Sequence, residues 1–281
     1  MTSDFVNDTA SAHRRPWNLS QASGFFIIGA WLLLTASAGL VLVHNPDAID
    51  IRNTFAPPSA QHWFGTDQVG RDVLARTIYG ARIDLLMCVL GVLPSLLIGT
   101  LIGLLSGYYR GVIDAILMRI YDVTIAFPFF VLVLAIVGVL GPGLVNFFIA
   151  LALVGWVTYA RLIRAEVLVI SGSEYVLAAR NLGYGDAVIL FRHILPNAIS
   201  PVLSYAMTDA VLVMLAGASL GFLGMGAQPP TPEWGVMIAD GQTFVDRAWW
   251  ICLFPGLATM SLGLGLVLVG DSLTQKRTRV G

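Results

Sequence analysis

Few side chains in this sequence could take part in catalysis or metal binding, and they are scattered along its 281 residues. The four histidines are His13, His44, His62 and His193, and the two cysteines are Cys88 and Cys252. No two histidines are three or four residues apart, the spacing that puts two ligands on one helix face. Both cysteines lie in apolar runs, which argues against a disulfide framework and a thiolate metal site. We therefore expect no metal site and no catalytic residue in this chain.

Asp209 is the one acidic residue that lies deep inside a long apolar segment. It lies 10 residues after Ile199, which is about 15 Å along a helix. At mid-membrane depth a carboxylate costs about 2.5–3.5 kcal/mol, so it must face other helices or a wet cavity. Two roles are open. Asp209 could form a structural hydrogen bond to a neighbouring span, with Tyr205 or Thr208 as local partners, or line a translocation pathway and meet a cationic group of a solute.

The composition indicates a membrane protein. Charged residues make up 12% of the chain, with 16 Lys and Arg against 17 Asp and Glu, whereas soluble proteins carry about 25%. Hydrophobic residues make up 57%, and the mean hydropathy is +0.78. A disordered chain needs the opposite composition. The net charge of -1 gives no basic field for nucleic acid. The sequence has no phosphate-binding loop of the Gly-x-x-x-x-Gly-Lys-Ser/Thr type, so we do not expect it to bind ATP.

Six segments are long and apolar enough to span a membrane, which takes about 20 residues. The charge-free run of 38 residues over 123–160 is too long for one helix, and Gly141-Pro142-Gly143 is a turn signal within it. We predict an all-α membrane protein with spans at 25–43, 85–105, 123–140, 144–160, 199–223 and 249–269. One domain, 25–270, then has a long loop at 161–198 and tails at 1–24 and 271–281.

The distribution of Lys and Arg predicts that both termini and the 161–198 loop are cytoplasmic. On one side of the six spans lie 11 of these residues, and on the other lie 5. In an alternative, Ala36-Ser37-Ala38 is a signal-peptidase site and Arg14-Arg15 belongs to a twin-arginine signal. The apolar run continues to Val43, past the possible cleavage point, so we expect an uncleaved first span.

The 161–198 loop carries the pattern of a short helix. Ser171 and Glu174 have the spacing of a capping box at its start. Gly183 supplies a left-handed residue at its end. An apolar stripe at positions i, i+3, i+4 and i+7 is formed by Tyr175, Ala178, Ala179 and Leu182. Such a helix could lie on the membrane surface or dock against another protein.

This segment resembles the "EAA" coupling loop of binding-protein-dependent ABC importers. The resemblance covers Tyr175 to Gly183 and the later pair Leu195-Pro196. The first Glu of the family motif falls on Leu177, and the nearby Glu174 could supply the acid. The resemblance implies that the ATPase-coupling residues are Glu174, Tyr175, Ala178, Ala179, Arg180, Leu182, Gly183, Leu195 and Pro196.

Other stretches are similar to the C-type permease of dipeptide and oligopeptide transporters. They are 64–73 (FGTDQVGRDV), Ala126-Phe127-Pro128, 141–144 (GPGL), Phe222-Leu223-Gly224, 228–235 (QPPTPEWG) and 254–257 (FPGL). Each is weak alone, but their order and spacing, from about His62 to Asp271, are specific to that subfamily.

Two segments on the outer side also have physical interpretations of their own. Thr66-Asp67 predicts a cap or an Asx-turn that opens a helix over 69–79. Three prolines between 229 and 232 make a stiff segment that leads to an acid and a tryptophan. Either segment could anchor the chain in the membrane interface, as Trp commonly does, or contact a solute receptor. The candidates for that contact are Asp67, Arg71, Asp72, Glu233 and Trp234.

The resemblance implies a multi-pass permease subunit in the bacterial inner membrane, without a cofactor or enzymatic activity of its own. The implied partners are a second homologous permease, two cytoplasmic ATPases that use ATP and Mg, an extracytoplasmic solute-binding protein and the lipid bilayer. Di- or oligopeptides are the expected solutes, and nickel chelates, glutathione and opine-like compounds are alternatives. Two other functions remain as alternatives, a proton-coupled transporter and an intramembrane enzyme. A proton-coupled transporter would normally be longer, with inverted repeats. An intramembrane enzyme would need several polar groups at one depth, whereas Asp209 stands alone.

Overall fold

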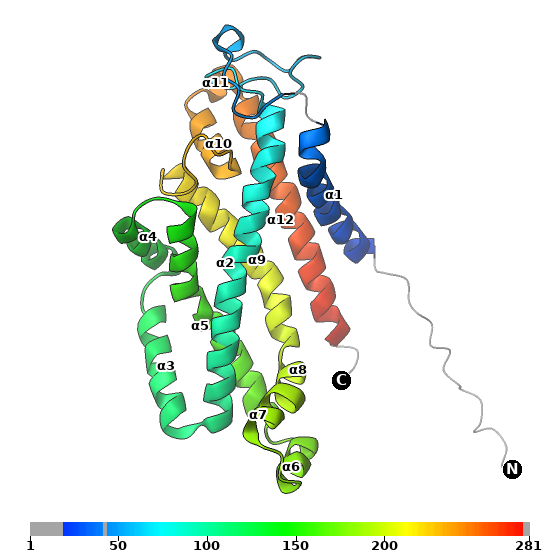
Figure 1. Cartoon of the computed structure of the whole chain (residues 1–281), viewed down its shortest axis with the longest axis vertical. Coiled ribbons are helices and arrows are strands. Elements are labelled where there is room, and N and C mark those ends of the chain that lie inside the picture. The colour runs from blue at the N-terminus through cyan, green and yellow to red at the C-terminus, as the bar shows by residue number, and fades with distance from the viewer. Residues whose placement is uncertain (1–18, 42–43, 278–281) are drawn as a thin grey trace, which may run out of the picture.

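The computed structural model describes residues 19–41 and 44–277, and all regular elements in these ranges are helices (Figure 1). The long helices are α1 (Leu19–Val41), α2 (Val73–Tyr109), α5 (Leu144–Ile170), α9 (Ser200–Phe222) and α12 (Trp250–Arg277). The shorter ones are η1 (Ile51–Asn53), α3 (Gly111–Ile125), α4 (Phe129–Leu140), α6 (Glu174–Asn181), α7 (Asp186–Val188), η2 (Ile189–Ile194), α8 (Leu195–Ala198), α10 (Trp234–Gln242) and α11 (Val245–Ala248). The Arg14-Arg15 pair lies outside the described residues.

The predicted all-α membrane fold is confirmed. Within the described ranges, 5 helices are long and apolar enough to cross a membrane, and α3 and α4 make a sixth span when counted as one bent unit. The helices extend beyond the apolar segments that predict them. For example, α2 begins at Val73 and α5 continues to Ile170, because helical hydrogen bonding does not stop where hydropathy falls.

The predicted third span, 123–140, is divided between two helices. The axes of α3 and α4 differ by 86°. The break falls at Ala126-Phe127-Pro128. Pro128 has no N–H to donate to the preceding turn, and its ring disfavours the helical conformation of Phe127. Pro128 is therefore the N-cap of α4 rather than a continuation of α3. Hydropathy alone misses this bend because the whole run is apolar.

Glycines let α2 approach α5 closely. Gly99 and Gly103 are four residues apart and lie on one face of α2. A Cβ atom at Gly99 would lie 2.3 Å from the Trp156 carbonyl oxygen, and one at Gly103 would lie 2.2 Å from that of Ala160. Small residues at this spacing commonly allow close helix packing in membranes. The α2–α5 pair is the central contact of the described bundle.

The two ends of the bundle carry different elements. One end, here called the α6 end, holds α6 and α7, and the opposite α10 end holds α10, α11 and the segment 44–72 (Figure 1). Helix α1 packs beside α12, where the Trp31 indole N–H donates a 2.9 Å hydrogen bond to Ser261 Oγ. The start of α1 and the end of α12 both point toward the α6 end (Figure 1).

Candidate functional site

The short helix predicted in the 161–198 loop is α6, but it starts differently from the prediction. Helix α5 extends into this loop, and the Ser171 hydroxyl donates a 2.6 Å hydrogen bond to the Val167 carbonyl of its last turn. Ser173 is the N-cap of α6, and its side chain makes no capping hydrogen bond. The predicted capping box of Ser171 and Glu174 is therefore wrong, because Ser171 belongs to the preceding helix.

The predicted end of α6 is confirmed. Gly183 has a φ of +81°, in the left-handed region that side chains disfavour. The Gly183 N–H donates to the Arg180 carbonyl at 2.9 Å, and the Tyr184 N–H donates to the Ala179 carbonyl at 3.2 Å. These two bonds form a Schellman motif, which satisfies carbonyl groups that the helix end would leave unpaired.

The face of α6 that packs against the chain differs from the predicted stripe. Val176 and Ala179 are buried, at 0% and 4% exposure. Ala178 and Leu182 are exposed. Ala179 packs inside this chain and cannot itself touch a partner, which corrects its predicted docking role. Exposed apolar side chains of α6 and the following turns form what we call the coupling surface, made of Tyr175, Leu177, Ala178, Leu182, Tyr184, Val188 and Phe191.

Two contacts tie this region to the end of α2. The Tyr108 hydroxyl donates a 2.7 Å hydrogen bond to Asp186 Oδ1. The Arg180 guanidinium group lies 4.9 Å from the centre of the Tyr108 ring, within the range of a cation–π interaction. The sequence identified Arg180 through the family resemblance, but it gave no signal for Tyr108 or Asp186, because they are distant from each other along the chain.

The segment after α7 leads directly into α9. It passes through η2, a π-helical turn, and α8, which starts with partly buried Leu195 and exposed Pro196. Proline fits this position because the first residues of a helix need no N–H partner. One nearly continuous helical path therefore joins the coupling surface to α9.

An ion pair that the sequence did not indicate holds α3 against α5. The Nε and Nη2 atoms of Arg164 donate to the two carboxylate oxygens of Asp114, each at 2.6 Å. The hydroxyl of Ser106, on α2, donates to the same carboxylate. A bidentate pair of this kind fixes orientation as well as distance. Three helices thus meet at Asp114 near the α6 end.

Asp209 is partly buried on α9 and faces α5. The hydroxyl of the fully buried Tyr159 donates a 2.7 Å hydrogen bond to Asp209 Oδ2. The ring of Tyr205 packs edge-on against that of Tyr159, with 5.2 Å between their centres. The prediction that Asp209 avoids lipid agrees with this geometry. The expected hydrogen bond to a neighbouring span is therefore present, and Tyr205, one of the two local partners expected, also interacts with Asp209.

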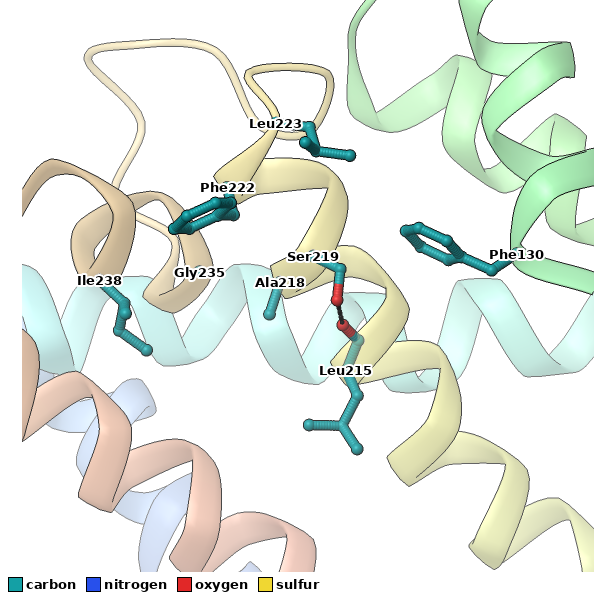
Figure 2. A pocket seen from close by; sticks show the side chains of 8 residues that line it. All are labelled: Phe130, Leu215, Ala218, Ser219, Phe222, Leu223, Gly235 and Ile238. Carbon is teal, nitrogen blue, oxygen red and sulfur yellow. Dashed lines mark hydrogen bonds between the residues drawn. The ribbon is translucent and has the colours of Figure 1, made fainter. Parts of the chain in front are cut away.

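An apolar hollow lies further along α9, toward the α10 end. Figure 2 shows Phe130 of α4 on one side and, on the other, Phe222 of α9 and Leu223, which follows the end of that helix. The Ser219 hydroxyl lies in this hollow but donates a 2.8 Å hydrogen bond to the Leu215 carbonyl (Figure 2). The hollow has a volume of about 620 Å³. Its walls therefore offer apolar contact and little hydrogen bonding.

At the α10 end, the predicted helix over 69–79 begins only at Val73, with Asp72 as its N-cap. Asp67 forms the predicted Asx-turn, because its Oδ1 accepts from the backbone N–H of Val69 at 2.9 Å. Arg71 Nε donates to Asp67 Oδ2 at 2.6 Å. Asp67 and Asp72 are buried at 3% and 5% exposure. They fix this loop internally, so the expectation that their side chains contact a receptor is wrong.

Glu233 and Trp234 are also buried, which corrects their predicted place at the outer interface. Glu233 is the N-cap of α10 and accepts from the backbone N–H groups of Gly235 and Val236, at 2.7 and 2.9 Å. Burial raises the pKa of Glu233 above its ordinary value, while the two N–H donors lower it. The Trp234 indole N–H donates to the Thr77 carbonyl of α2 at 2.8 Å.

The stiff proline segment therefore delivers Glu233 and Trp234 into the protein interior rather than to its rim. Asp84, on α2, is fully buried beside them and accepts a 3.3 Å hydrogen bond from the Trp234 backbone N–H. Composition suggests an interfacial Trp, but it cannot tell a lipid-facing ring from one inserted between helices. The path of the chain from α9 to α10 determines that the Trp234 ring is inserted between helices.

Comparison with known proteins identifies the kind of chain this is. The family described as "Binding-protein-dependent transport system inner membrane component" matches residues 99–279. The dipeptide transport system permease protein of Alkalihalophilus pseudofirmus is 41% identical over 250 residues, which cover 89% of this chain and 82% of that protein. The glutathione transport system permease protein of Pectobacterium atrosepticum is 42% identical over 270 residues, covering 92% of this chain and 90% of that protein.

A solved structure supports the fold. The crystal structure of an amino acid ABC transporter with histidines matches with a TM-score of 0.53 and 20% identity. The match covers 73% of this chain and 94% of the other. At that identity the likeness concerns the helix arrangement alone.

Proposed function

The chain belongs to the family of binding-protein-dependent transport system inner membrane components, and from this premise we propose that it is one of two permease subunits of an ATP-driven importer for di- or oligopeptides. The observation that carries the proposal is the coupling surface at one end of a multi-pass bundle. A second, homologous permease completes the pathway, and an extracytoplasmic binding protein delivers the solute. Both termini and the coupling surface are cytoplasmic, in agreement with the Lys and Arg distribution.

The coupling surface receives a separate ATPase subunit. The sequence has no phosphate-binding loop of its own, so ATP and Mg bind to the partner subunits. The surface is apolar, and Leu182 is its most exposed large side chain, at 77%. Exposed apolar surface of this kind commonly marks a protein contact. Ala179 supports the surface from behind by letting α6 pack closely on its own chain.

Closure of the ATPases moves the membrane helices through two connections. The first is the Tyr108–Asp186 hydrogen bond and the Arg180–Tyr108 contact, which lead to α2. The second is the helical path from η2 through α8 to α9. Asp209 and the apolar hollow both lie on α9. A shift of this helix therefore changes the wall that we assign to the translocation pathway.

Peptides are the favoured solutes because the dipeptide relative matches along most of both chains. The glutathione relative matches to a similar extent. Glutathione is itself a small peptide, so the same pathway chemistry suits both. A mostly apolar hollow in which the Ser219 hydroxyl is already paired suits a pathway that passes varied side chains and leaves their selection to the binding protein.

Reconstitution in proteoliposomes tests the function. We expect uptake of a labelled dipeptide only when the second permease, the ATPases, the binding protein and ATP are all present. Excess glutathione competes if the alternative solute is correct. Uptake that follows a proton gradient without ATP would contradict the proposal and favour a secondary transporter.

The role of the coupling surface has a matched test. Leu182→Asp places a charge on this surface. We expect that the ATPases no longer co-purify with this variant and that uptake stops. The control is Ile51→Asp, a residue of similar exposure, 80% against 77%, at the α10 end. Retention of the ATPases by the Leu182 variant would exclude this surface as the dock.

A further inference from the structure

Two histidines and a carboxylate meet at the α10 end. His62 Nδ1 lies 2.9 Å from Asp72 Oδ2, and His44 Nδ1 lies 3.8 Å from the same oxygen. The candidate ligand atoms of all three residues lie within 4.8 Å of one another. The two imidazole rings are 4.9 Å apart, centre to centre. The site is separate from the coupling surface and from Asp209, and the proposed transport function does not use it.

We propose that His44, His62 and Asp72 bind a divalent transition metal of the Zn²⁺ class. Zn²⁺ takes nitrogen and carboxylate oxygen ligands at about 2.0–2.2 Å, which puts ligands of a tetrahedral site about 3.4 Å apart. The separations of 2.9 and 3.8 Å lie on either side of this value. Small rotations of the two imidazole rings are enough to bring their nitrogens to one ion.

A hydrogen bond alone does not account for this cluster. His62 is within hydrogen-bonding distance of Asp72, but His44 at 3.8 Å is not. A metal explains why both rings direct Nδ1 toward one oxygen. Two neutral imidazoles and one carboxylate are a ligand set that suits zinc and related ions.

The surrounding backbone fixes the ligands in place. The other Asp72 oxygen, Oδ1, accepts a 2.7 Å hydrogen bond from the Ala75 N–H, which orients the carboxylate. The His62 carbonyl accepts from the Ser59 N–H at 2.8 Å and closes the turn that carries this residue. A hydrogen bond to the ligating carboxylate, as at Asp72, commonly raises metal affinity.

His44, the third ligand, is held in place through the backbone that follows it. The buried Arg76 donates a 3.2 Å hydrogen bond to the Pro46 carbonyl, which secures the segment after His44. His44 is 45% exposed. It and Asp72 border a hollow of about 710 Å³ between α1 and α2, which leaves room for water as a fourth ligand. The metal would therefore clamp the segment that follows α1 onto the start of α2.

Zinc binding to the full-length, tag-free chain, purified with its partner subunits and treated with a chelator, tests this assignment. We expect one additional Zn²⁺ per permease chain relative to a His44→Ala complex, measured by competition with a chromophoric chelator. The Zn²⁺ affinity of this site should fall at least tenfold in His44→Ala. Even residues that only hydrogen-bond to a metal ligand change affinity by about tenfold to a hundredfold when they are replaced. His193→Ala, which removes a histidine at the α6 end, should leave it unchanged.

The His44 side chain is 45% exposed, so we expect its variant to remain folded, and a size-exclusion profile checks this. Co²⁺ provides a second measurement. A tetrahedral site gives strong visible absorption, which should be lost in His44→Ala and kept in His193→Ala. Equal Zn²⁺ affinity in wild type and His44→Ala, or Co²⁺ absorption that does not depend on His44, would overturn the proposal.

Discussion

The Tyr159 hydroxyl donates a 2.7 Å hydrogen bond to Asp209 Oδ2 and so joins α5 to α9 inside the bundle. Tyr159 is fully buried, and Asp209 is partly buried. This bond supports a structural role for Asp209. Asp209 also lies on α9, the helix that follows the coupling surface, and this position suits a role in the pathway. The two residues can be changed separately, which makes the roles distinguishable.

If Asp209 lines the pathway, Asp209→Asn should slow uptake, with a larger effect on cationic than on neutral peptides, because the amide keeps an acceptor for Tyr159 and removes only the charge. Tyr159→Phe keeps the charge and should leave this solute preference unchanged. Its loss of a buried hydrogen bond should lower stability by about 1–3 kcal/mol. Uptake by proteoliposomes and thermal unfolding in detergent measure the two effects. Normal uptake of every peptide by Asp209→Asn would leave Asp209 as a packing residue.

Gly183 and Gly185 offer a matched pair for the turn after α6. A Cβ atom at either position meets no heavy atom within 4 Å, but only Gly183 has a positive φ, +81°. Gly183→Ala should therefore cost about 1 kcal/mol of backbone strain or more. It should also weaken solute-stimulated ATP hydrolysis by distorting the coupling surface. Gly185→Ala should have little effect on either quantity. Equal ATPase rates in both variants would show that the left-handed turn does not matter for coupling.

Ala178 and Ala179 are adjacent but face opposite ways. Ala178→Glu changes the exposed coupling surface, so we expect loss of ATPase co-purification from a chain that remains folded. Ala179→Glu places a charge at a position with 4% exposure, where a buried, unpaired carboxylate is strongly destabilising. That variant should unfold at a lower temperature. Co-purification and thermal unfolding of both variants give the comparison, and the reverse pattern would mean that α6 presents its other face.

Gly103 should be needed for the approach of α2 to α5. A methyl group there would lie 2.2 Å from the Ala160 carbonyl oxygen. We expect Gly103→Ala to separate the helices and to destabilise the protein by about 1–3 kcal/mol, the usual effect of overpacking. Gly29→Ala is the control, because a Cβ atom at Gly29 meets nothing within 4 Å. Thermal unfolding measures both, and equal melting temperatures would contradict the close packing of α2 and α5.

Glu233 should matter for folding rather than for receptor contact. Glu233→Ala removes the acceptor of two backbone N–H groups at the start of α10, and we expect a loss of about 1–3 kcal/mol. Glu174→Ala changes an exposed side chain at the start of α6 and should change stability little. Binding of the solute receptor to the Glu233→Ala complex, measured below its melting temperature, should stay normal. Weakened receptor binding in this folded complex would restore a direct contact role.

The sequence by itself determined the class of the protein and the location of its most informative loop. Apolar runs specify membrane helices because bilayer thickness sets their length, and the left-handed glycine at Gly183 follows from a local rule that needs no partner. The family motifs are similarly local, so the order of those segments was readable along the chain.

Only the tertiary structure decided what each polar or aromatic side chain faces. Trp234 and Glu233 are residue types that commonly anchor a chain at the membrane interface, but here they lie in the interior. Ala179 packs inward, whereas its neighbour Ala178 faces outward. The Asp209–Tyr159 bond joins residues of two separate helices, and the cluster of His44, His62 and Asp72 depends on how the 44–72 segment folds. Such contacts depend on how whole helices and loops pack, and local spacing carries no information about that packing.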